Sequence, residues 1–186
     1  MKKFELTNEF ITNMFGTKLF RIRALVEFGD VEAGELGGYV EKESNLGHDD
    51  NAWVYDNAWV YGDAQVSGDA LVYDNARVYG DAQVSGDAWV YGNARVYGDA
   101  RVCGNGDYAY AHGFGSVNRT TTFFRLKDGG VGVRCGCFYG TLAQFRDKIR
   151  ETHGESAIAE EYLDLAALME KRFRRTGNEQ KTEEES

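Results

Sequence analysis

Small and aliphatic residues alternate with polar or aromatic ones in nine consecutive six-residue units between Asn51 and Gly104. Each unit reads Asn/Asp-Ala-x-Val-x-Gly/Asp, with no insertion between units. Alternate residues of an extended strand lie on one face, so the Ala and Val of each unit point the same way. We therefore predict one short strand and one corner per unit, with an inward-facing row formed by Val54, Val60, Val66, Val72, Val78, Val84, Val90, Val96 and Val102.

The units repeat with a longer period of 18 residues. Residues 63–80 and 81–98 differ only where Leu71 is replaced by Trp89 and Asp74 by Gly92. Three strands per coil predict a triangular parallel β-helix, whose coils stack into a solenoid. The pattern resembles the left-handed hexapeptide-repeat helix, and this resemblance implies a left-handed winding. A right-handed helix is the alternative, because Gly here comes one position later than in that family.

The three sides of the predicted prism carry different residues. One is polar, with Gln65, Ser67, Gln83, Ser85, Arg101 and Cys103. A second is apolar, with Trp53, Tyr55, Leu71, Tyr73, Trp89 and Tyr91, and we expect it to be an oligomer or partner interface. The third side combines basic and aromatic residues, namely Trp59, Tyr61, Arg77, Tyr79, Arg95 and Tyr97. Its residues Arg77, Tyr79, Arg95 and Tyr97, together with Arg119, could hold a nucleotide, or the rings could simply stabilise neighbouring coils.

The sequence before the repeats predicts a segment that covers the N-terminal end of the solenoid core. Alternation over residues 18–28 predicts a strand, and residues 34–50 predict an imperfect first coil with Leu46 in an Ala position and His48 in a Val position. We place the N-terminal strand and cap region at residues 1–44 and the β-helix at residues 45–116, so that Tyr108 and Phe114 continue the Val row.

Residues 117–175 predict a β-hairpin followed by two helices. The hairpin would turn at residues 128–130. Thr141 and Gln144 form a capping box for the first helix, which Gly154 would end, and Ser156 would cap the second. The polar residues 176–186 predict a disordered acidic tail. The predicted fold is thus an all-β solenoid with an N-terminal strand cap and a C-terminal hairpin plus two helices.

Composition excludes several classes of function. The net charge of -9 argues against direct nucleic-acid binding, and three Cys, an odd number, argue against a disulfide framework. No stretch has the length and apolarity of a membrane span, so we expect a cytoplasmic protein that does not contact membranes. We also expect the chain to associate with itself, as a trimer by resemblance to hexapeptide-repeat proteins, or otherwise as a dimer.

No catalytic residue, cofactor or metal is predicted. An acyltransferase of this fold uses a His base, but His48, His112 and His153 all lie outside the regular coils. Cys135 and Cys137 would share one face of a strand, and they form a tetrahedral zinc site only if His153 or a second subunit contributes. The predicted role of these thiols is to pack as small apolar residues.

Three stretches carry a wider resemblance: KLFRIRALVEFGDVEAGELGGYVEKESNL, the hexad run, and CGCFYGTLAQFRDKIRETHG. Together they resemble a group of phage and prophage hexapeptide-repeat, or polymer-forming, proteins. The resemblance implies a phage origin and action in a bacterial host cell, and it transfers no catalytic residue. We expect a non-enzymatic antagonist of a host defence system, which binds a host protein complex or sequesters a nucleotide. An acyltransferase-like enzyme and a structural self-assembling protein are the alternatives.

Overall fold

The computed structural model describes residues 2–115 and 117–184, with side chains up to residue 177. The chain forms two compact units, Met1–Asn105 and Gly106–Ser186. The predicted N-terminal cap and the regular coils belong to one unit. The second unit begins at Gly106, whereas the sequence placed the end of the β-helix at residue 116.

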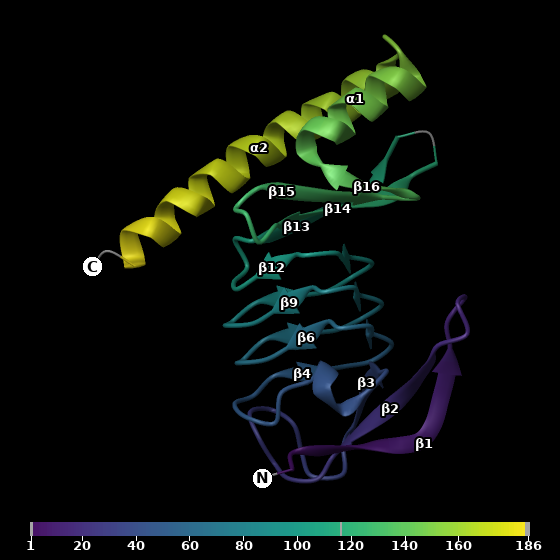
Figure 1. The fold of residues 1–186 in the computed structure, drawn as a ribbon, viewed down its shortest axis with the longest axis vertical. Coiled ribbons are helices and arrows are strands. Elements are labelled where there is room, and N and C mark those ends of the chain that lie inside the picture. The colour runs from purple at the N-terminus through teal and green to yellow at the C-terminus, as the bar shows by residue number, and fades with distance from the viewer. Residues whose placement is uncertain (1, 116, 185–186) are drawn as a thin grey trace. The chain divides into compact units, whose positions relative to one another are not determined.

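The first unit is built on a β-solenoid with three sides, which confirms the predicted fold class (Figure 1). Each hexad contributes a two-residue strand that pairs in parallel with the strand 18 residues later, as Trp59 does with Arg77. The three stacks are β4-β7-β10, β5-β8-β11 and β6-β9-β12. Their bounds are β4 Trp53–Val54, β5 Trp59–Val60, β6 Gln65–Val66, β7 Leu71–Val72, β8 Arg77–Val78, β9 Gln83–Val84, β10 Trp89–Val90, β11 Arg95–Val96 and β12 Arg101–Val102. The left-handed winding stays a prediction.

The solenoid core consists of the predicted Ala and Val rows. Every Ala and Val of the hexads, from Ala52 to Val102, is completely buried. Backbone N–H groups donate to the next coil, as when Trp59 bonds the carbonyl of Ala76 at 2.9 Å. Burying one Val contributes about 1.5–3 kcal/mol before conformational entropy is subtracted. Repetition of a small buried pair therefore produces the stack of coils.

The corners use the residues that tolerate a left-handed backbone. Most corner positions before the Asn/Asp are Gly, for example Gly62 at φ 71°, but Asp56 and Asp74 adopt φ 52° and 60°. The Asp56 carboxylate accepts from the Asp74 N–H at 3.3 Å, and the Asp74 carboxylate accepts from the Gly92 N–H at 3.0 Å. These acidic corner residues bond to backbone in the next coil, which is a structural role.

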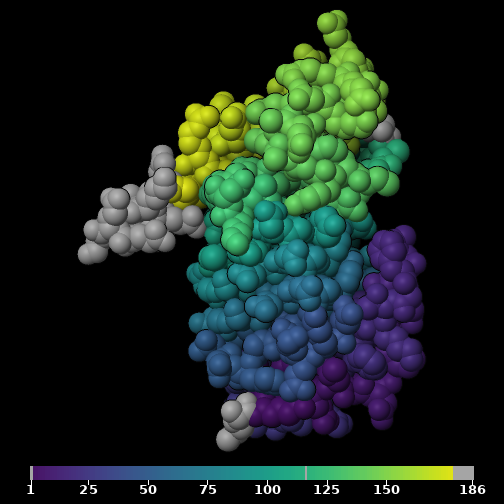
Figure 2. Space-filling view, in the orientation of Figure 1, coloured from purple at the N-terminus to yellow at the C-terminus, as the bar shows by residue number. Residues whose placement is uncertain are grey.

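An antiparallel hairpin extends one side of the solenoid. β1 (Phe4–Thr12) pairs with β2 (Lys18–Ala24), which pairs with β3 (Leu36–Val40), and β3 runs parallel to β5. The six-stranded sheet has the order β1-β2-β3-β5-β8-β11. The predicted strand at residues 18–28 ends at Ala24, and β1 was not predicted. Figure 2 shows this N-terminal segment in purple beside the blue and teal coils.

The first coil has a different register from the one that the hexad phase predicts. Val40 pairs with Val60 and Leu46 bridges to Val66, so Leu46 occupies a Val position and not an Ala position. His48 is therefore outside the Val row. Paired residues of this coil and the next are two residues further apart in the sequence than the regular period of 18. The two additional residues lie in the corner before Asn51.

Lys3 closes this widened corner. Its ammonium group donates to the carbonyls of Asp49, Asp50 and Ala52, at 3.5, 3.2 and 2.9 Å. The residue is almost fully buried, and this burial lowers the pKa of Lys3 despite the neighbouring carboxylates. Lys3 thus satisfies three carbonyls that the irregular coil leaves without a strand partner.

The second unit is a four-stranded antiparallel meander with two helices. Its strands are β13 (Tyr108–Phe114), β14 (Arg119–Arg125), β15 (Val131–Cys135) and β16 (Phe138–Thr141). Tyr108 pairs with Phe124 across β13 and β14, so residues 108–114 form a sheet strand and not the predicted further coil. The turn at residues 128–130 is confirmed, with the Asp128 side chain accepting from the Gly130 N–H at 2.8 Å.

Both predicted helices are present, with α1 at Leu142–His153 and α2 at Ala157–Glu184. Thr141 and Gln144 form the capping box, and Gly154 ends α1 at φ 58°. Ser156 accepts from the Ala159 N–H at 3.3 Å. The apolar helix residues pack on the sheet in one cluster, which contains Phe123, Val133, Leu142, Phe145, Ile149, Ala159, Tyr162, Leu165, Ala166, Met169 and Phe173.

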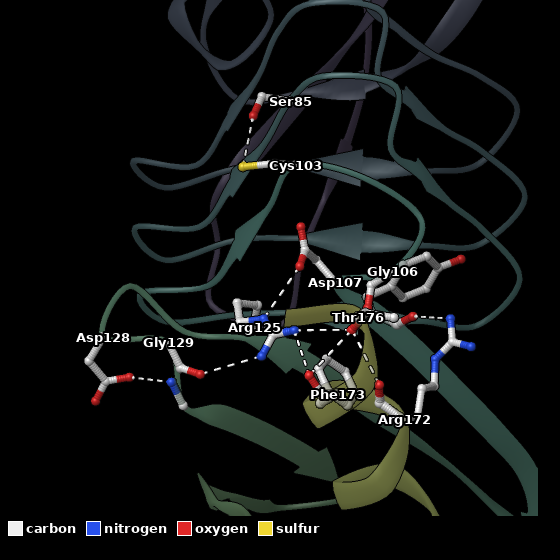
Figure 3. A network of polar contacts seen from close by, with 12 residues as sticks. Ser85, Cys103, Gly106, Asp107, Arg125, Asp128, Gly129, Arg172, Phe173 and Thr176 are labelled. Carbon is white, nitrogen blue, oxygen red and sulfur yellow. Dashed lines mark hydrogen bonds and ion pairs between the residues drawn. The ribbon is translucent and has the colours of Figure 1, made fainter. Parts of the chain in front are cut away.

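The predicted disordered tail begins inside α2, which continues to Glu184; residues 185–186 lie outside the described residues. Thr176 is buried and donates to the Gly106 carbonyl at 3.2 Å. Arg125 donates from Nη2 to the Phe173 carbonyl at 3.0 Å and to the Thr176 hydroxyl at 3.1 Å, and its Nε pairs with buried Asp107 at 3.4 Å (Figure 3). This network holds α2 at Phe173 and Thr176, where the predicted disordered tail would begin.

Candidate functional site

The apolar side of the solenoid, which we call the tryptophan face, consists of Trp53, Tyr55, Leu71, Tyr73, Trp89 and Tyr91. The structure corrects the prediction for Trp53, whose side chain is 0% exposed. The rings of Phe28 and Phe4 meet it edge-on, with centroids 5.2 and 6.2 Å away. A side chain at Gly37 would clash with the Trp53 ring, so this glycine makes room for it. Trp53 therefore belongs to the core.

The later coils leave the tryptophan face open. Trp89 is 49% exposed and Tyr91 is 38% exposed, while Leu71 and Tyr73 are half-buried. Tyr73 and Tyr91 stack with centroids 5.1 Å apart. The Asn105 side chain accepts from the Trp89 N–H at 2.9 Å, which satisfies a strand donor at the last coil. Whether this face forms an oligomer interface stays a prediction.

The third side, which we call the arginine–tyrosine face, consists of Trp59, Tyr61, Arg77, Tyr79, Arg95 and Tyr97. This face lies on β5, β8 and β11. The 18-residue repeat places Trp59, Arg77 and Arg95 side by side on successive coils. The Arg77 guanidinium lies over the Trp59 ring, 3.9 Å from its centroid. Beside it Tyr61, Tyr79 and Tyr97 form a column with centroid separations of 4.9 and 4.5 Å.

Arg77 is electrostatically unusual in this acidic protein. Burial, and secondarily the nearby Arg95, lower the pKa of Arg77. Within the described part of the chain, no carboxylate lies at ion-pair distance from Arg77. The face therefore presents the partly desolvated Arg77 cation against the Trp59 ring. This arrangement suits binding of a carboxylate or phosphate group of a ligand.

The N-terminal hairpin extends this face in a way that the sequence did not reveal. Tyr39 pairs with Trp59 on one side and Arg21 on the other. The Tyr39 hydroxyl accepts from Arg21 at 3.0 Å and donates to Glu9 at 3.0 Å. The alternation over residues 18–28 predicted a strand that includes Arg21, but the pairing of β2 with β3, and of β3 with the solenoid strand β5, was not predicted.

Arg119, the fifth predicted ligand residue, lies on β14 in the other unit. Together with Cys135, Cys137 and His153 it lines a cavity of about 270 Å³ within that unit. Cys135 ends β15, whereas Cys137 lies in a turn with Gly136 at φ 57°, so the two thiols do not lie on one continuous strand face as predicted. Among the described residues, no cluster of His, Cys, Asp and Glu could hold a metal ion.

The histidine positions bear on the acyltransferase alternative. His48 accepts from the Lys3 N–H at its Nδ1 (3.2 Å), and its Nε2 lies 2.9 Å from a Glu43 oxygen. Both ring nitrogens are thus engaged, which leaves none for a general base. His112, an exposed residue of β13 in the second unit, contacts the Thr120 hydroxyl at 2.8 Å.

Comparison with known proteins bears on the repeat alone. The sequence model of the YdcK beta solenoid repeat matches residues 64–80, 72–86 and 88–104. No curated protein compared with the chain matches it. Over the described residues, no helix combines the length and apolarity needed to cross a membrane. The chain is therefore similar to a known β-solenoid repeat over residues 64–104, the region that displays the later coils of both aromatic faces.

Proposed function

We propose that the protein is a non-enzymatic binding protein that recognises an anionic surface of a host protein through the arginine–tyrosine face. One observation carries the proposal: the half-buried Arg77 cation rests on Trp59 with no carboxylate partner among the described residues. A cation that has lost part of its hydration gains most from a ligand carboxylate that replaces the missing water. Arg, Tyr and Trp are also the residue types that dominate binding energy at protein interfaces.

The shape of the face supports a macromolecular partner. Its side chains lie on three parallel strands at successive coils, and the tyrosine rings stack on one another. Such a stack is stiff, so little side-chain entropy would be lost on binding. A free nucleotide is the alternative ligand for the same cations, and the thermal-shift comparison below distinguishes it from a protein partner.

The biological setting of this proposal comes from the resemblance to phage and prophage proteins. In that setting the partner belongs to a host defence system in the bacterial cytoplasm, and the protein acts by covering a surface of a host complex. The contacts of both ring nitrogens of His48 with Lys3 and Glu43 disfavour this residue as the general base of an acyltransferase.

Affinity capture from a host lysate, followed by mass spectrometry, tests the proposal. The bait pair is the wild type and Arg77→Gln/Arg95→Gln. The control Arg101→Gln/Arg150→Gln removes two charges from other surfaces. We expect a protein that is captured by the wild type and the control, and lost with Arg77→Gln/Arg95→Gln. Equal capture by all three baits would exclude this face.

Two further results separate the alternatives. A rise in melting temperature with a linear or cyclic nucleotide, abolished by Arg77→Gln/Arg95→Gln, would assign the face to nucleotide binding instead. Loss of the biological effect in His112→Gln/His153→Gln, with a native circular dichroism spectrum, would revive an enzymatic function. His48 is left unchanged because it contacts Lys3 and Glu43 within the fold.

A further inference from the structure

The second unit contains a half-enclosed cavity of about 270 Å³ that the solenoid function does not use. It lies among β14, the turn between β15 and β16, and the two helices. Its apolar wall is formed by Phe138, Phe145, Ile149 and the ring of Tyr162. Phe145 lies 5.4 Å from Phe138 and 5.9 Å from Tyr162, measured between ring centroids. A space of this kind suits the flat body of a small aromatic molecule.

Two glycines make room for the polar groups of the cavity. A Cβ at Gly136 would come within 1.9 Å of the Arg119 guanidinium, and one at Gly115 within 2.0 Å of the Tyr162 hydroxyl. Both glycines adopt positive φ, 57° and 75°. A side chain at Gly115 would displace the rigid Tyr162 ring, and at both positions the positive φ would strain any other residue type.

Tyr162 is part of an ordered chain of hydrogen bonds. The Thr121 hydroxyl donates to the Cys135 sulfur at 3.1 Å, Cys135 donates to the Tyr162 hydroxyl at 3.9 Å, and Tyr162 donates to the Phe114 carbonyl at 3.4 Å. Burial, with a smaller effect of Cys135, raises the pKa of Tyr162 to about 12. The phenol is therefore neutral at physiological pH and adds no negative charge to the cavity.

The charges around the cavity favour an anion. Lys148 pairs with Glu151 at 3.0 Å. The Glu161 carboxylate accepts from the Gly115 N–H at 2.6 Å and keeps its negative charge, but it does not line the cavity. Arg119 has no ion-pair partner within the part of the chain that the structure describes. His153, stacked on Tyr162 at 5.9 Å, offers a further ring at the wall. One uncompensated guanidinium thus lies at the edge of an apolar space.

We propose that this cavity binds a small aromatic molecule bearing one phosphate or carboxylate group. The ring packs against Phe145 and Tyr162, and the anion takes a two-point hydrogen bond from Arg119. This site is independent of the arginine–tyrosine face. It places a small-molecule ligand in the second unit, where a cavity exists, and leaves the solenoid face to a macromolecule.

Calorimetric titration of the full chain tests the proposal with four probes: phenyl phosphate, benzoate, benzyl alcohol and inorganic phosphate. We expect phenyl phosphate or benzoate to bind, and the relative affinity of these two identifies the preferred anion. Benzyl alcohol lacks the charge and inorganic phosphate lacks the ring, so each should bind at least ~10-fold more weakly. Equal affinity for all four probes, or no binding by either aromatic anion at millimolar concentration, would overturn the proposal.

Alkylation by iodoacetamide locates the bound probe. Cys137 is exposed at the cavity, whereas Cys103 is an exposed thiol of the solenoid and serves as the internal control. Trypsin separates them, because Arg119 and Arg134 lie between them in the sequence. The bound probe should slow modification of Cys137 and leave that of Cys103 unchanged. Protection of neither thiol, or of both equally, would contradict binding in this cavity.

Two variants complete the test. Arg119→Gln should weaken phenyl phosphate binding by ~10-fold or more, whereas Arg150→Gln, on the exposed surface of α1, should not. Thr152→Trp, at an exposed lining position, should block entry without disturbing the core. Circular dichroism verifies the fold of each variant. Unchanged affinity in a folded Arg119→Gln and a folded Thr152→Trp would refute the site.

Discussion

Replacing Trp53 distinguishes a core residue from an interface residue. The ring is fully buried against Phe4 and Phe28, whereas the equivalent Trp89 is half exposed. Truncating a buried Trp to Ala costs about 3–5 kcal/mol of folding free energy, because it removes apolar burial and leaves a cavity. We therefore expect Trp53→Ala to destabilise the solenoid by about 3–5 kcal/mol. Trp89→Ala should cost about 1 kcal/mol or less, as is usual for exposed positions.

Trp53→Phe provides a second, quantitative comparison. The Trp53 Nε1–H is buried and has no hydrogen-bond partner among the residues that the structure describes. A Phe side chain buries about two carbon groups fewer than Trp, which lowers the folding stability by about 1.6 kcal/mol at about 0.8 kcal/mol per group. It also removes an unsatisfied donor that costs about 1–3 kcal/mol. These effects nearly cancel, so Trp53→Phe should lie within about 1 kcal/mol of the wild type.

Urea unfolding followed by circular dichroism and by the remaining tryptophans measures these differences. Acrylamide quenching of the native state adds an independent check, because Trp89 should be accessible to the quencher and Trp53 protected. The reasoning is refuted if Trp53→Ala and Trp89→Ala have equal midpoints. It is also refuted if Trp53→Phe is as damaging as Trp53→Ala.

Three further predictions concern association, the helix network and pH. Replacing both Trp89 and Tyr91 with Lys should lower the mass measured by light scattering while circular dichroism stays unchanged; an unchanged mass would rule out self-association through this face. Arg125→Ala removes the ion pair with buried Asp107 and should cost about 3–5 kcal/mol in thermal unfolding, whereas a loss below about 1 kcal/mol would contradict the network. The pKa of Tyr162 is raised from 10.0 to about 12, so the folded state binds its proton more tightly and stability should fall as pH rises from about 10 towards 12. Tyr162→Phe should lessen this fall, and an identical pH profile would contradict the assignment.

The solenoid was predictable because its sequence is locally consistent. Ala and Val recur at fixed positions, and the backbone of each strand bonds to the strand one coil away in the stack. The three sides therefore follow from counting residues. The capping box at Thr141 and the turn at residues 128–130 were predictable for the same reason, since each depends on side chains within a few residues.

The errors lie where distant segments meet. Burial of Trp53 depends on Phe4 and Phe28, which no periodicity connects to it. The register of Leu46 was wrong because an additional length of chain enters the corner that Lys3 closes. Composition predicted a disordered tail from Thr176, but the Arg125 network holds that turn of α2 in place.

The cavity around Arg119 also escaped prediction, although part of its signal was present. Cys135-Gly136-Cys137 was interpreted as a strand, whereas the positive φ of Gly136 makes a turn that admits the guanidinium. A glycine between two cysteines could have indicated such a turn. The partners from α1 and α2, Lys148 and Tyr162, could not have been assigned, because they reach the cavity only through helix packing.

The most direct test of the central claim is the affinity between the purified host protein and three versions of this chain: wild type, Arg77→Gln/Arg95→Gln, and Arg101→Gln/Arg150→Gln. If the arginine–tyrosine face is the binding surface, the dissociation constant should rise by ~30-fold or more in the first variant, which corresponds to about 2 kcal/mol for a central interface arginine. The charge-matched variant should bind like the wild type. Equal dissociation constants for all three would contradict the claim.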